Sequence, residues 1–225
     1  GIPQNRKRVF FFAAKKFNKS ENLVEKFFLN LESSKENIEK AVIKDALFNL
    51  RKLKPKKIKN DRLNEYIESG FNIEEKKNKL TNRYIDLINH NKKSKFTFNH
   101  KARYNNPRDI EIFSRLPQGS DSTHKNIKHI MPYKNRLGIF KDKYFKLQNN
   151  KISKTITSHM KFDCNMYIHP TQSRGLTPRE AARIQSFSDN YFFEGTLSQC
   201  YSQIGNAVPP ILSNHICKSI EKIND

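Results

Sequence analysis

One short apolar run near the start of the chain, residues 9–14, constrains the fold more than any other feature. It reads Val9-Phe10-Phe11-Phe12-Ala13-Ala14 and follows a segment that contains Pro3. A continuous apolar run of this length predicts a strand buried on both faces, as in a parallel sheet. The chain contains no βαβ repeats after this run to supply the neighbouring strands. Because it also begins at Gly1 rather than Met, we expect a piece of a longer protein whose sheet is completed elsewhere.

Basic charge is concentrated in the first three quarters of the chain. The 225 residues include 43 Lys plus Arg and 22 Asp plus Glu, which gives a net charge of +21. Residues 171–225 hold equal numbers of both signs, so the whole excess lies in residues 1–170. This balance favours a polyanionic partner, most simply nucleic acid, with an anionic membrane surface as the alternative. No apolar run approaches the ~18 residues of a transmembrane helix, so we expect no membrane span.

The cysteines and glycines exclude several kinds of site. Cys164, Cys200 and Cys217 are odd in number and widely spaced, which excludes a disulfide framework and a CxxC metal pair. We expect them to be reduced thiols in a cytoplasmic protein, and we expect no metal site. No two of the seven glycines form a GxG pair, so the chain has no dinucleotide fingerprint or phosphate-binding loop.

Residues 20–91 are polar and lysine-rich, with apolar residues at helical spacing. Stripes that begin at Leu23, at Ala41 and, more weakly, at Leu63 each predict a short amphipathic helix. Pro55 interrupts this pattern within a lysine-rich stretch and predicts an exposed loop there.

Two kinds of element are expected in the second half. The β-type composition predicts a small sheet of short strands at residues 144–147, 154–157 and 166–168. Thr177-Pro178-Arg179-Glu180 has the pattern of a capping box, so a helix should begin there and run to about Phe187. A last helix is predicted to start at Asn206, with two prolines in its first turn.

Three segments, in this order, carry a resemblance to a known family. They are residues 1–8 (GIPQNRKR), residues 174–187 (RGLTPREAARIQSF) and residues 203–210 (QIGNAVPP). Together they resemble the last three conserved blocks of the cytosine-5 DNA methyltransferases, of which the first is a Gln-x-Arg-x-Arg block. That family carries its variable DNA-reading region between the first two of these blocks. The long, basic and irregular interval in this chain is similar to such a region.

The resemblance implies a fold and a division of the chain. Residues 1–16 would be a strand segment of the catalytic domain, and residues 17–170 the DNA target-recognition region. Residues 171–225 would be the C-terminal helices that return to the catalytic domain. The fold class is then α+β: a recognition region of short strands and helices, flanked by elements that complete a doubly wound α/β methyltransferase domain.

The blocks that would carry out the chemistry are absent from this sequence. The family begins with a block that holds S-adenosylmethionine, followed by a Pro-Cys pair and a Glu-Asn-Val block. Cys164, Cys200 and Cys217 follow Asp, Gln and Ile, so no nucleophilic Cys follows a proline here. The chain therefore resembles the C-terminal part of such an enzyme, and the resemblance implies an N-terminal methyltransferase half or subunit as its partner.

Gln4, Arg6 and Arg8 match the Gln-x-Arg-x-Arg block, so the resemblance implies that they lie at the catalytic pocket. Arg6 and Arg8 are two residues apart on an extended segment and should point to the same side. A planar, permanently charged guanidinium suits contacts with a carboxylate and with the cytosine, and Lys would replace it poorly. The alternative is two surface arginines ahead of a strand.

The final block implies contacts with the cofactor S-adenosyl-L-methionine through Asn206, Ala207 and Val208, although the missing half would hold most of the cofactor. A purely structural alternative is that Asn206 is the N-cap of the last helix. In the second block we expect a structural role, holding the helix against the recognition region, for Arg174, Thr177, Glu180 and Arg183.

The recognition region should supply the contacts with double-stranded DNA. Thr155-Ile156 resembles a short Thr-aliphatic pair that lies near the flipped base in this family. Lysines of the region most simply neutralise phosphates. Base edges are within the expected reach of Arg103, Arg136 and Lys151, and the alternative is that these residues contact phosphates and only position the DNA.

These observations lead to one main hypothesis and one alternative. The main hypothesis is the C-terminal portion of a DNA (cytosine-5-)-methyltransferase, which binds a specific duplex site and helps to position the flipped cytosine. It would belong to a restriction-modification system with a cognate restriction enzyme. The alternative is a non-catalytic DNA-binding module or a truncated relic that lacks the catalytic half.

Overall fold

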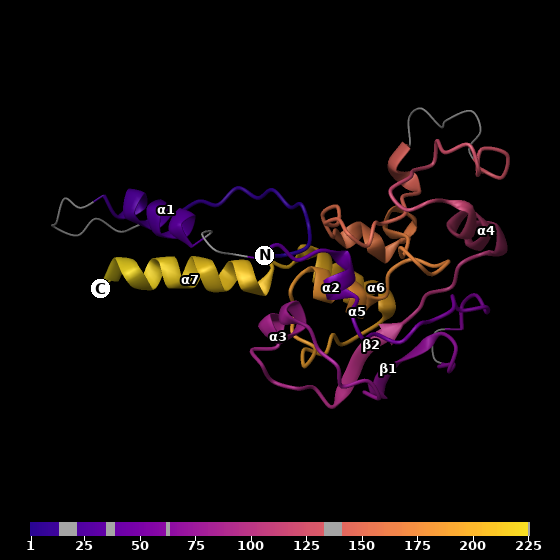
Figure 1. Cartoon of the computed structure of the whole chain (residues 1–225), viewed down its shortest axis with the longest axis horizontal. Helices are drawn as coiled ribbons and strands as arrows, with labels where there is room; N and C mark the ends of the chain where they lie inside the picture. The colour runs from indigo at the N-terminus through magenta and orange to yellow at the C-terminus, as the bar shows by residue number, and fades with distance from the viewer. Residues whose placement is uncertain (14–21, 35–38, 62–63, 133–140, 225) are drawn as a thin grey trace.

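The computed structural model describes residues 1–13, 22–34, 39–61, 64–132 and 141–224 (Figure 1). Among them, the regular elements are α1 (Leu23–Ser33), α2 (Ile43–Ala46), β1 (Gly70–Glu75), α3 (Arg83–Ile88), β2 (Phe96–Lys101), α4 (Pro107–Arg115), three 3₁₀ turns η2 (Lys141–Lys143), η3 (Ser158–Lys161) and η4 (Asn165–Tyr167), then α5 (Pro178–Ile184), α6 (Leu197–Asn206) and α7 (Pro210–Asn224). None of the helices described combines the length and apolar character needed to cross a membrane. The mixture of helices and strands agrees with the expected α+β class.

The two-stranded sheet begins directly after a segment in which the sequence predicted a helix. Strands β1 and β2 pair antiparallel, with Gly70 opposite Lys101 and Glu75 opposite Phe96. The helix predicted from the stripe at Leu63 is wrong: residues 66–69 form a turn, and residues 62 and 63 lie outside the described part. Gly70 explains why a turn and then a strand form here instead of a helix. Its φ is +88°, and a Cβ there would lie 2.1 Å from the carbonyl oxygen of His100, so only glycine fits.

The small sheet expected at residues 144–168 is replaced by isolated bridges. Lys146 pairs with Ile168, and Ile168 pairs on its other side with Gly175. Turns η3 and η4 interrupt the chain on either side of residues 162–164, so pairing stops after a single residue. The β-type residues still enter a core: Tyr144 and Ile168 are buried with α4.

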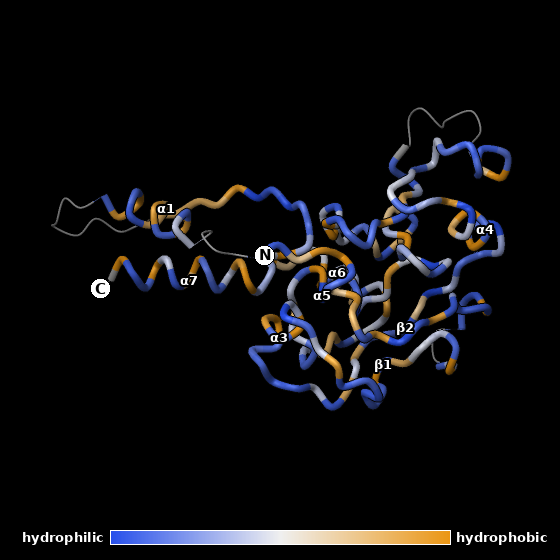
Figure 2. The backbone as a smooth tube through the Cα atoms, viewed as in Figure 1, coloured by the Kyte–Doolittle hydropathy of each residue, from blue (hydrophilic) through white to orange (hydrophobic). Residues whose placement is uncertain are grey.

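The strand expected at the start of the chain is also wrong for the residues described. Residues 9–13 form no strand, and Val9 and Phe11 are 80% and 96% exposed. Residue 14 lies outside the described part. Figure 2 shows this apolar stretch as an extended tube that leads from the body to α1. The physical reason is the absence of any neighbouring strand in the described residues, because a strand forms only when its backbone groups have a partner.

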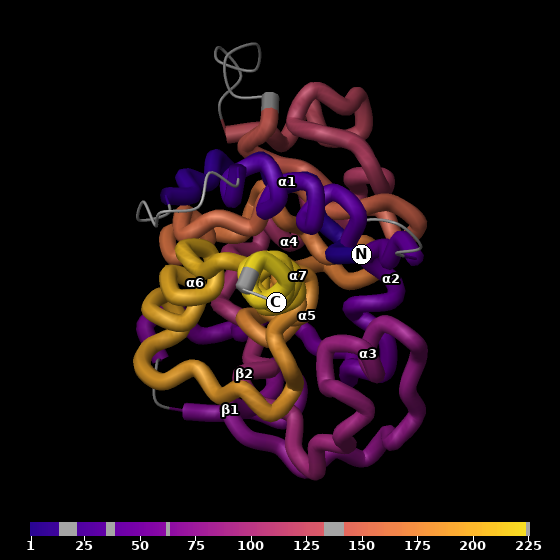
Figure 3. The backbone as a smooth tube through the Cα atoms, turned by 90° about the vertical axis from the view of Figure 1, so that its left-hand side faces the viewer, coloured from indigo at the N-terminus to yellow at the C-terminus, as the bar shows by residue number. Residues whose placement is uncertain are grey.

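Helices α1 and α7 lie side by side and form an arm that projects from the body (Figures 1 and 3). Helix α1 confirms the stripe predicted from Leu23. Asn22 caps it by accepting a hydrogen bond from the backbone N–H of Glu25. Phe27 is buried in the arm and stacks on Phe12 with 4.3 Å between the ring centroids.

Helix α5 lies in the main core, and all seven of its residues are buried. The predicted capping box is confirmed: the Thr177 hydroxyl accepts from Glu180 N at 3.2 Å, and the Glu180 carboxylate accepts from Thr177 N at 2.8 Å. The helix ends at Ile184 instead of Phe187, because Ser186 adopts a left-handed conformation with φ of 65°. The apolar partners around α5 are Ile43, Ala46, Tyr84, Ile85, Ile88, Tyr201 and Ile204.

The last two helices meet at a different residue from the one predicted. Asn206 ends α6 and does not cap the last helix, which begins at Pro210. Pro210 lacks a backbone N–H and has a fixed φ, so it suits the first helical position. The N–H of Ile211, one of the first-turn donors, is satisfied by the hydroxyl of Ser186 at 3.2 Å.

Two buried ion pairs fix α5 to its surroundings. Arg174 donates to both carboxylate oxygens of Glu180 at 2.7 and 2.8 Å, and both side chains are 1% exposed. Arg183 donates to both oxygens of Asp189 at 2.7 and 2.8 Å and to the carbonyl of Phe48 at 2.7 Å. The arginines hold the pKa of both carboxyl groups well below their usual range, against the opposing effect of burial.

We predict that Glu180→Ala destabilises the protein by about 3–5 kcal/mol, because it leaves the Arg174 guanidinium buried without a counter-charge. Chemical denaturation, followed by circular dichroism, measures this loss. The control is Glu111→Ala, which breaks the exposed pair with Arg115 and should cost less than about 1 kcal/mol. Equal small losses in the two variants would contradict a structural role for the buried pair.

Candidate functional site

Residues 3–6 dock along residues 153–156. Gln4 pairs with Ser153 in a parallel bridge, in which Asn5 N donates to Ser153 O and Ser153 N donates to Pro3 O, both at 2.8 Å. The hydroxyl of Thr155 donates to the carbonyl of Asn5 at 2.6 Å. The segment that matches the Gln-x-Arg-x-Arg block is thus held against the Thr155-Ile156 pair, about 150 residues later in the chain.

A chain of two buried amides joins all three segments that carry the resemblance. The Gln4 side chain accepts a hydrogen bond from Ile156 N at 3.1 Å and donates to the side-chain oxygen of Gln185. Gln185, which is fully buried, donates in turn to the carbonyl of Ile204 at 2.8 Å. We call this chain the amide relay. Because each amide both donates and accepts, replacing one leaves a buried partner unsatisfied.

Arg6 connects two of the same segments through its guanidinium group. It donates to the carbonyl oxygen of Ile156 at 2.6 Å and to that of Gly205 at 3.0 Å. Its Nε atom is buried and has no acceptor in the described part of the chain. Arg8, by contrast, is exposed. The two arginines expected to act together therefore occupy different environments.

Gly205 is the point of closest approach between α6 and the segment that follows Ile156. A Cβ there would lie 2.0 Å from Ser158 N and 2.2 Å from the carbonyl carbon of Thr157. Both atoms belong to the backbone and cannot rotate away as a side chain would. Glycine at this position therefore lets α6 lie directly against turn η3.

The predicted cofactor residues follow Gly205 immediately and lie at the surface. Asn206 is exposed, Ala207 is half-buried and Val208 is 43% exposed. A shallow depression beside them is lined by Glu194, Gly195, Gln199, Ser202, Gln203 and Asn206. This arrangement offers one polar edge and does not enclose a ligand.

The predicted DNA-reading residues have separate surroundings. Arg103 donates to the carbonyls of Met160 and Phe162, both at 2.9 Å, so protein acceptors occupy two of its nitrogen atoms. Lys151 is exposed. Arg136 lies outside the described residues.

Two buried histidines lie beside the Arg174–Glu180 pair. His100 Nε2 lies 2.8 Å from the carbonyl of Arg51, so it carries the proton and Nδ1 accepts from the Thr177 hydroxyl at 3.1 Å. His169 Nε2 lies 3.6 Å from Glu180. Burial lowers the pKa of His100 to about 4 and that of His169 to about 3, so both are neutral at pH 7.

Two of the three cysteine thiols lack the features of a nucleophile. Cys164 and Cys200 are buried, and burial raises the pKa of both thiols. A catalytic cysteine needs the opposite, an accessible thiol with a lowered pKa. Cys217 is exposed on α7.

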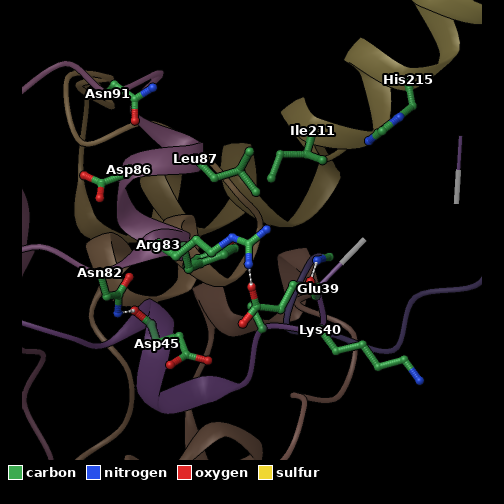
Figure 4. Close-up of a pocket in the computed structure, with 13 residues that line it drawn as sticks. Glu39, Lys40, Asp45, Asn82, Arg83, Asp86, Leu87, Asn91, Ile211 and His215 are labelled. Atoms are coloured by element: carbon green, nitrogen blue, oxygen red, sulfur yellow. Dashed lines mark hydrogen bonds and ion pairs between the residues drawn. The ribbon is translucent and has the colours of Figure 1, made fainter. Parts of the chain in front are cut away.

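A separate pocket opens between α2, α3 and the start of α7 (Figure 4). In the figure the side chains of Glu39 and Arg83 point toward one another and form an exposed ion pair, and His215 faces the same space from α7. None of the residues predicted to be catalytic or to bind the cofactor lines it. Within the described ranges, no group of three or more His, Cys, Asp or Glu side chains is placed to bind a metal.

The chain belongs to the C-5 cytosine-specific DNA methylase family, because the profile of that family matches residues 1–222. It is 33% identical to the type II methyltransferase M.Bpa9945I of Bacillus paralicheniformis over 99% of this chain and 48% of that protein. It is 30% identical to the type II methyltransferase M.DdeI of Desulfomicrobium norvegicum over 98% of this chain and 51% of that protein. The chain thus spans about half the length of the curated relatives it matches.

A solved structure supports the fold. The chain resembles a protein assigned as a DNA modification methyltransferase encoded within a prophage of E. coli, with a TM-score of 0.59 and 20% identity. The match covers 84% of this chain and 49% of that chain. At this identity the likeness concerns the arrangement of elements, which is that of part of a methyltransferase.

We predict that Gly205→Ala destabilises the protein by about 1–3 kcal/mol, because the added methyl forces the backbone of residues 157 and 158 away from α6. Thermal unfolding of the variant measures the loss. Ser202→Ala, on the same helix, serves as the control and should change stability by no more than about 0.5 kcal/mol. An unchanged unfolding temperature in Gly205→Ala would contradict the close approach.

We also predict that the protein loses stability as the pH falls from 6.5 to 4. The folded-state pKa values of His100 and His169 lie below the ordinary 6.5, so the unfolded chain binds more protons in this window and acid favours unfolding. Each histidine contributes up to about 1.4 kcal/mol per pH unit. Urea denaturation at a series of pH values measures the slope. His100→Gln should flatten it, whereas exposed His129→Gln should leave it unchanged.

Proposed function

We propose that this chain is the C-terminal portion of a DNA (cytosine-5-)-methyltransferase, which binds a specific duplex site and helps to position the flipped cytosine. The observation that carries the proposal is the meeting of all three family segments at the amide relay and Arg6. Segments separated by up to 199 residues in sequence come together there around main-chain carbonyls. Family membership and the match to about half of each relative support the same assignment.

The recognition region supplies the contacts with DNA in this proposal. A cytosine inside a duplex must be flipped out, at a cost of a few kcal/mol, before it can react. Thr155 and Ile156 are fixed to residues 4–6 through both backbone and side-chain hydrogen bonds. Their position relative to the catalytic segment is therefore set before DNA binds, which lowers the entropic cost of aligning the base.

The cofactor would be shared between this chain and its missing half. S-adenosylmethionine supplies the methyl group when it is bound. The exposed Asn206 amide and the apolar surface of Ala207 and Val208 suit one edge of such a ligand, and they adjoin Gly205, to which Arg6 donates. Because this edge encloses nothing by itself, an N-terminal half or subunit would provide the rest of the site.

The same N-terminal half would provide the nucleophilic cysteine, since none of the thiols here follows a proline. As the relatives named above are type II methyltransferases, we place the enzyme in a cytoplasmic restriction-modification system with a cognate restriction enzyme. The net charge of +21 alone favours a second candidate, a DNA-binding module or relic without catalytic function. The two candidates differ in whether a complementary half restores methyl transfer.

We predict that mixing this chain with an N-terminal methyltransferase half that carries the Pro-Cys and cofactor blocks restores methyl transfer to duplex DNA. Incorporation of a radiolabelled methyl group measures it. Arg6→Lys should lower the rate about tenfold to a hundredfold, because Lys cannot bond both carbonyls with one planar group. Lys7→Gln changes the adjacent exposed side chain and should leave the rate unchanged.

Two results would overturn this function. One is a folded mixture of both halves that transfers no methyl group. The other is an Arg6→Lys mixture with the rate of the unaltered chain, which would remove Arg6 from the site. Sequence-preferring DNA binding without any methyl transfer would favour the DNA-binding module instead.

A further inference from the structure

A pocket rich in lysines lies at the end of the β1–β2 sheet where residues 76–95 connect the two strands, away from the site described above. It is lined by Lys76 and Lys79 on one side and by Lys92, Lys93 and Lys95 on the other. We call it the lysine pocket. Figures 1 and 3 show residues 76–95 at the opposite end of the body from α4 and the residues that follow it. No residue predicted from the sequence to read DNA lines it.

The fold itself brings the two groups of lysines together. The last pair of the sheet register, Glu75 with Phe96, places the two chain segments side by side. Beyond it, Lys76 N donates to the carbonyl of Lys95 at 2.9 Å and extends the ladder by one bond. The lysines thus face one another because of the strand pairing, although up to 19 positions separate them in sequence.

The return of the chain into the pocket is fixed as well. His90 and Asn91 both adopt left-handed conformations, with φ of 50° and 57°, and reverse the chain at the end of α3. Asn89 is buried at this turn and accepts from the backbone N–H of Asp189 at 2.7 Å. The lysines that follow are therefore presented from an anchored turn.

The charges around the pocket do not balance. Its acidic lining residues are Glu75 and Asp86, against five lysines, and Asp86 also accepts from the Thr81 hydroxyl at 2.7 Å. Asp189 Oδ2 lies 3.4 Å from Lys76 Nζ, but both carboxylate oxygens of Asp189 already accept hydrogen bonds from the guanidinium group of Arg183. Within the described part of the chain, the ammonium groups of Lys92, Lys93 and Lys95 form no ion pair.

The pKa of Lys76 is lowered from its ordinary value. Burial is the main cause that lowers its pKa, and the neighbouring Arg183 and Arg179 lower it further, while Asp189 opposes them. A bound anion would relieve this repulsion.

We propose that the lysine pocket binds the sugar–phosphate backbone of duplex DNA that flanks the target site, without reading its sequence. This proposal rests on the proposed DNA-binding function and extends it to a second, separate surface. Lysines are flexible point charges that neutralise phosphates and impose little geometry, so they suit contacts that are independent of sequence. Because the pocket lies far from α4, it would contact the DNA backbone at a distance from any bases that residues such as Thr155 and Ile156 contact.

The test measures binding of the full chain to a labelled duplex of arbitrary sequence over a range of salt concentrations. The variant is Lys92→Gln/Lys93→Gln/Lys95→Gln, which removes three unpaired charges and leaves the backbone bond of Lys95 intact. Each phosphate contact contributes about 0.9 to the slope of log affinity against log salt. The slope should therefore fall by about 2.7 in the variant.

Two controls separate this effect from net charge and from folding. Lys44→Gln/Lys218→Gln/Lys222→Gln removes the same charge from exposed positions on α2 and α7, and the slope should not change. Lys92→Arg/Lys93→Arg/Lys95→Arg keeps the charge and should retain the slope of the unaltered chain. Equal slopes in the pocket variant and the charge-matched control would overturn the proposal, as would an unaltered chain that fails to bind duplex DNA.

The outcome is separable from that of the proposed function. A reduced slope with no methyl transfer from the reconstituted halves would retain the phosphate site and reject the methyltransferase function. Methyl transfer by the reconstituted halves, with an unchanged salt slope in the pocket variant, would retain the methyltransferase function and reject the phosphate site. If the pocket variant instead loses affinity for the N-terminal half while DNA binding is unchanged, the pocket is a protein contact and the proposal is wrong.

Discussion

The ion pair between Arg174 and Glu180 is the interaction on which the rest of the structure depends. Two charges at 1% exposure are tolerated only because each oxygen of the carboxylate has a hydrogen-bond donor. This pair holds the first turn of α5 in place, and the pair of Arg183 with Asp189 holds its last turn. Since α5 is buried on every side, the segments around it can take only the positions that complete these bonds. The loop at Phe48 is placed in this way, because its carbonyl accepts a hydrogen bond from Arg183.

The candidate site is assembled from segments that have no local reason to meet. Gln4 lies near one end of the chain and Ile204 near the other, and two buried glutamine side chains connect them through the amide relay. The relay and Arg6 use different atoms of the same partner, Ile156, whose N–H and carbonyl are both engaged. This double attachment fixes residue 156 in position and in orientation. In the proposed function, a recognition region attached in this way would keep bound DNA in a fixed position relative to residues 4–6.

Local chemistry made part of this structure predictable. The cap at Thr177 and the apolar stripe of α1 were foreseen because their signals lie within a few residues of each other. The strand predicted from the apolar run at residues 9–14 does not form at residues 9–13, since a strand depends on neighbours and none is present among the residues described. The sheet at β1 and β2 was missed because Gly70, rather than periodicity, decides it. Gln185 stands inside a segment quoted for its resemblance, yet only the tertiary structure reveals its two partners, and the same holds for the protein acceptors around Arg103.

The bonds of Arg6 end on carbonyl oxygens of the main chain, at Ile156 and Gly205. Every amino acid carries such a carbonyl. The joint that Arg6 makes with residues 156 and 205 therefore requires a particular backbone path and a glycine at position 205, and it does not depend on the side chains of the neighbouring residues. In the proposed function, mutations could therefore alter the side chains that contact DNA while the joint stays intact. A methyltransferase of the proposed kind, built on this joint, could acquire a new target sequence during evolution while its catalytic centre stays unchanged.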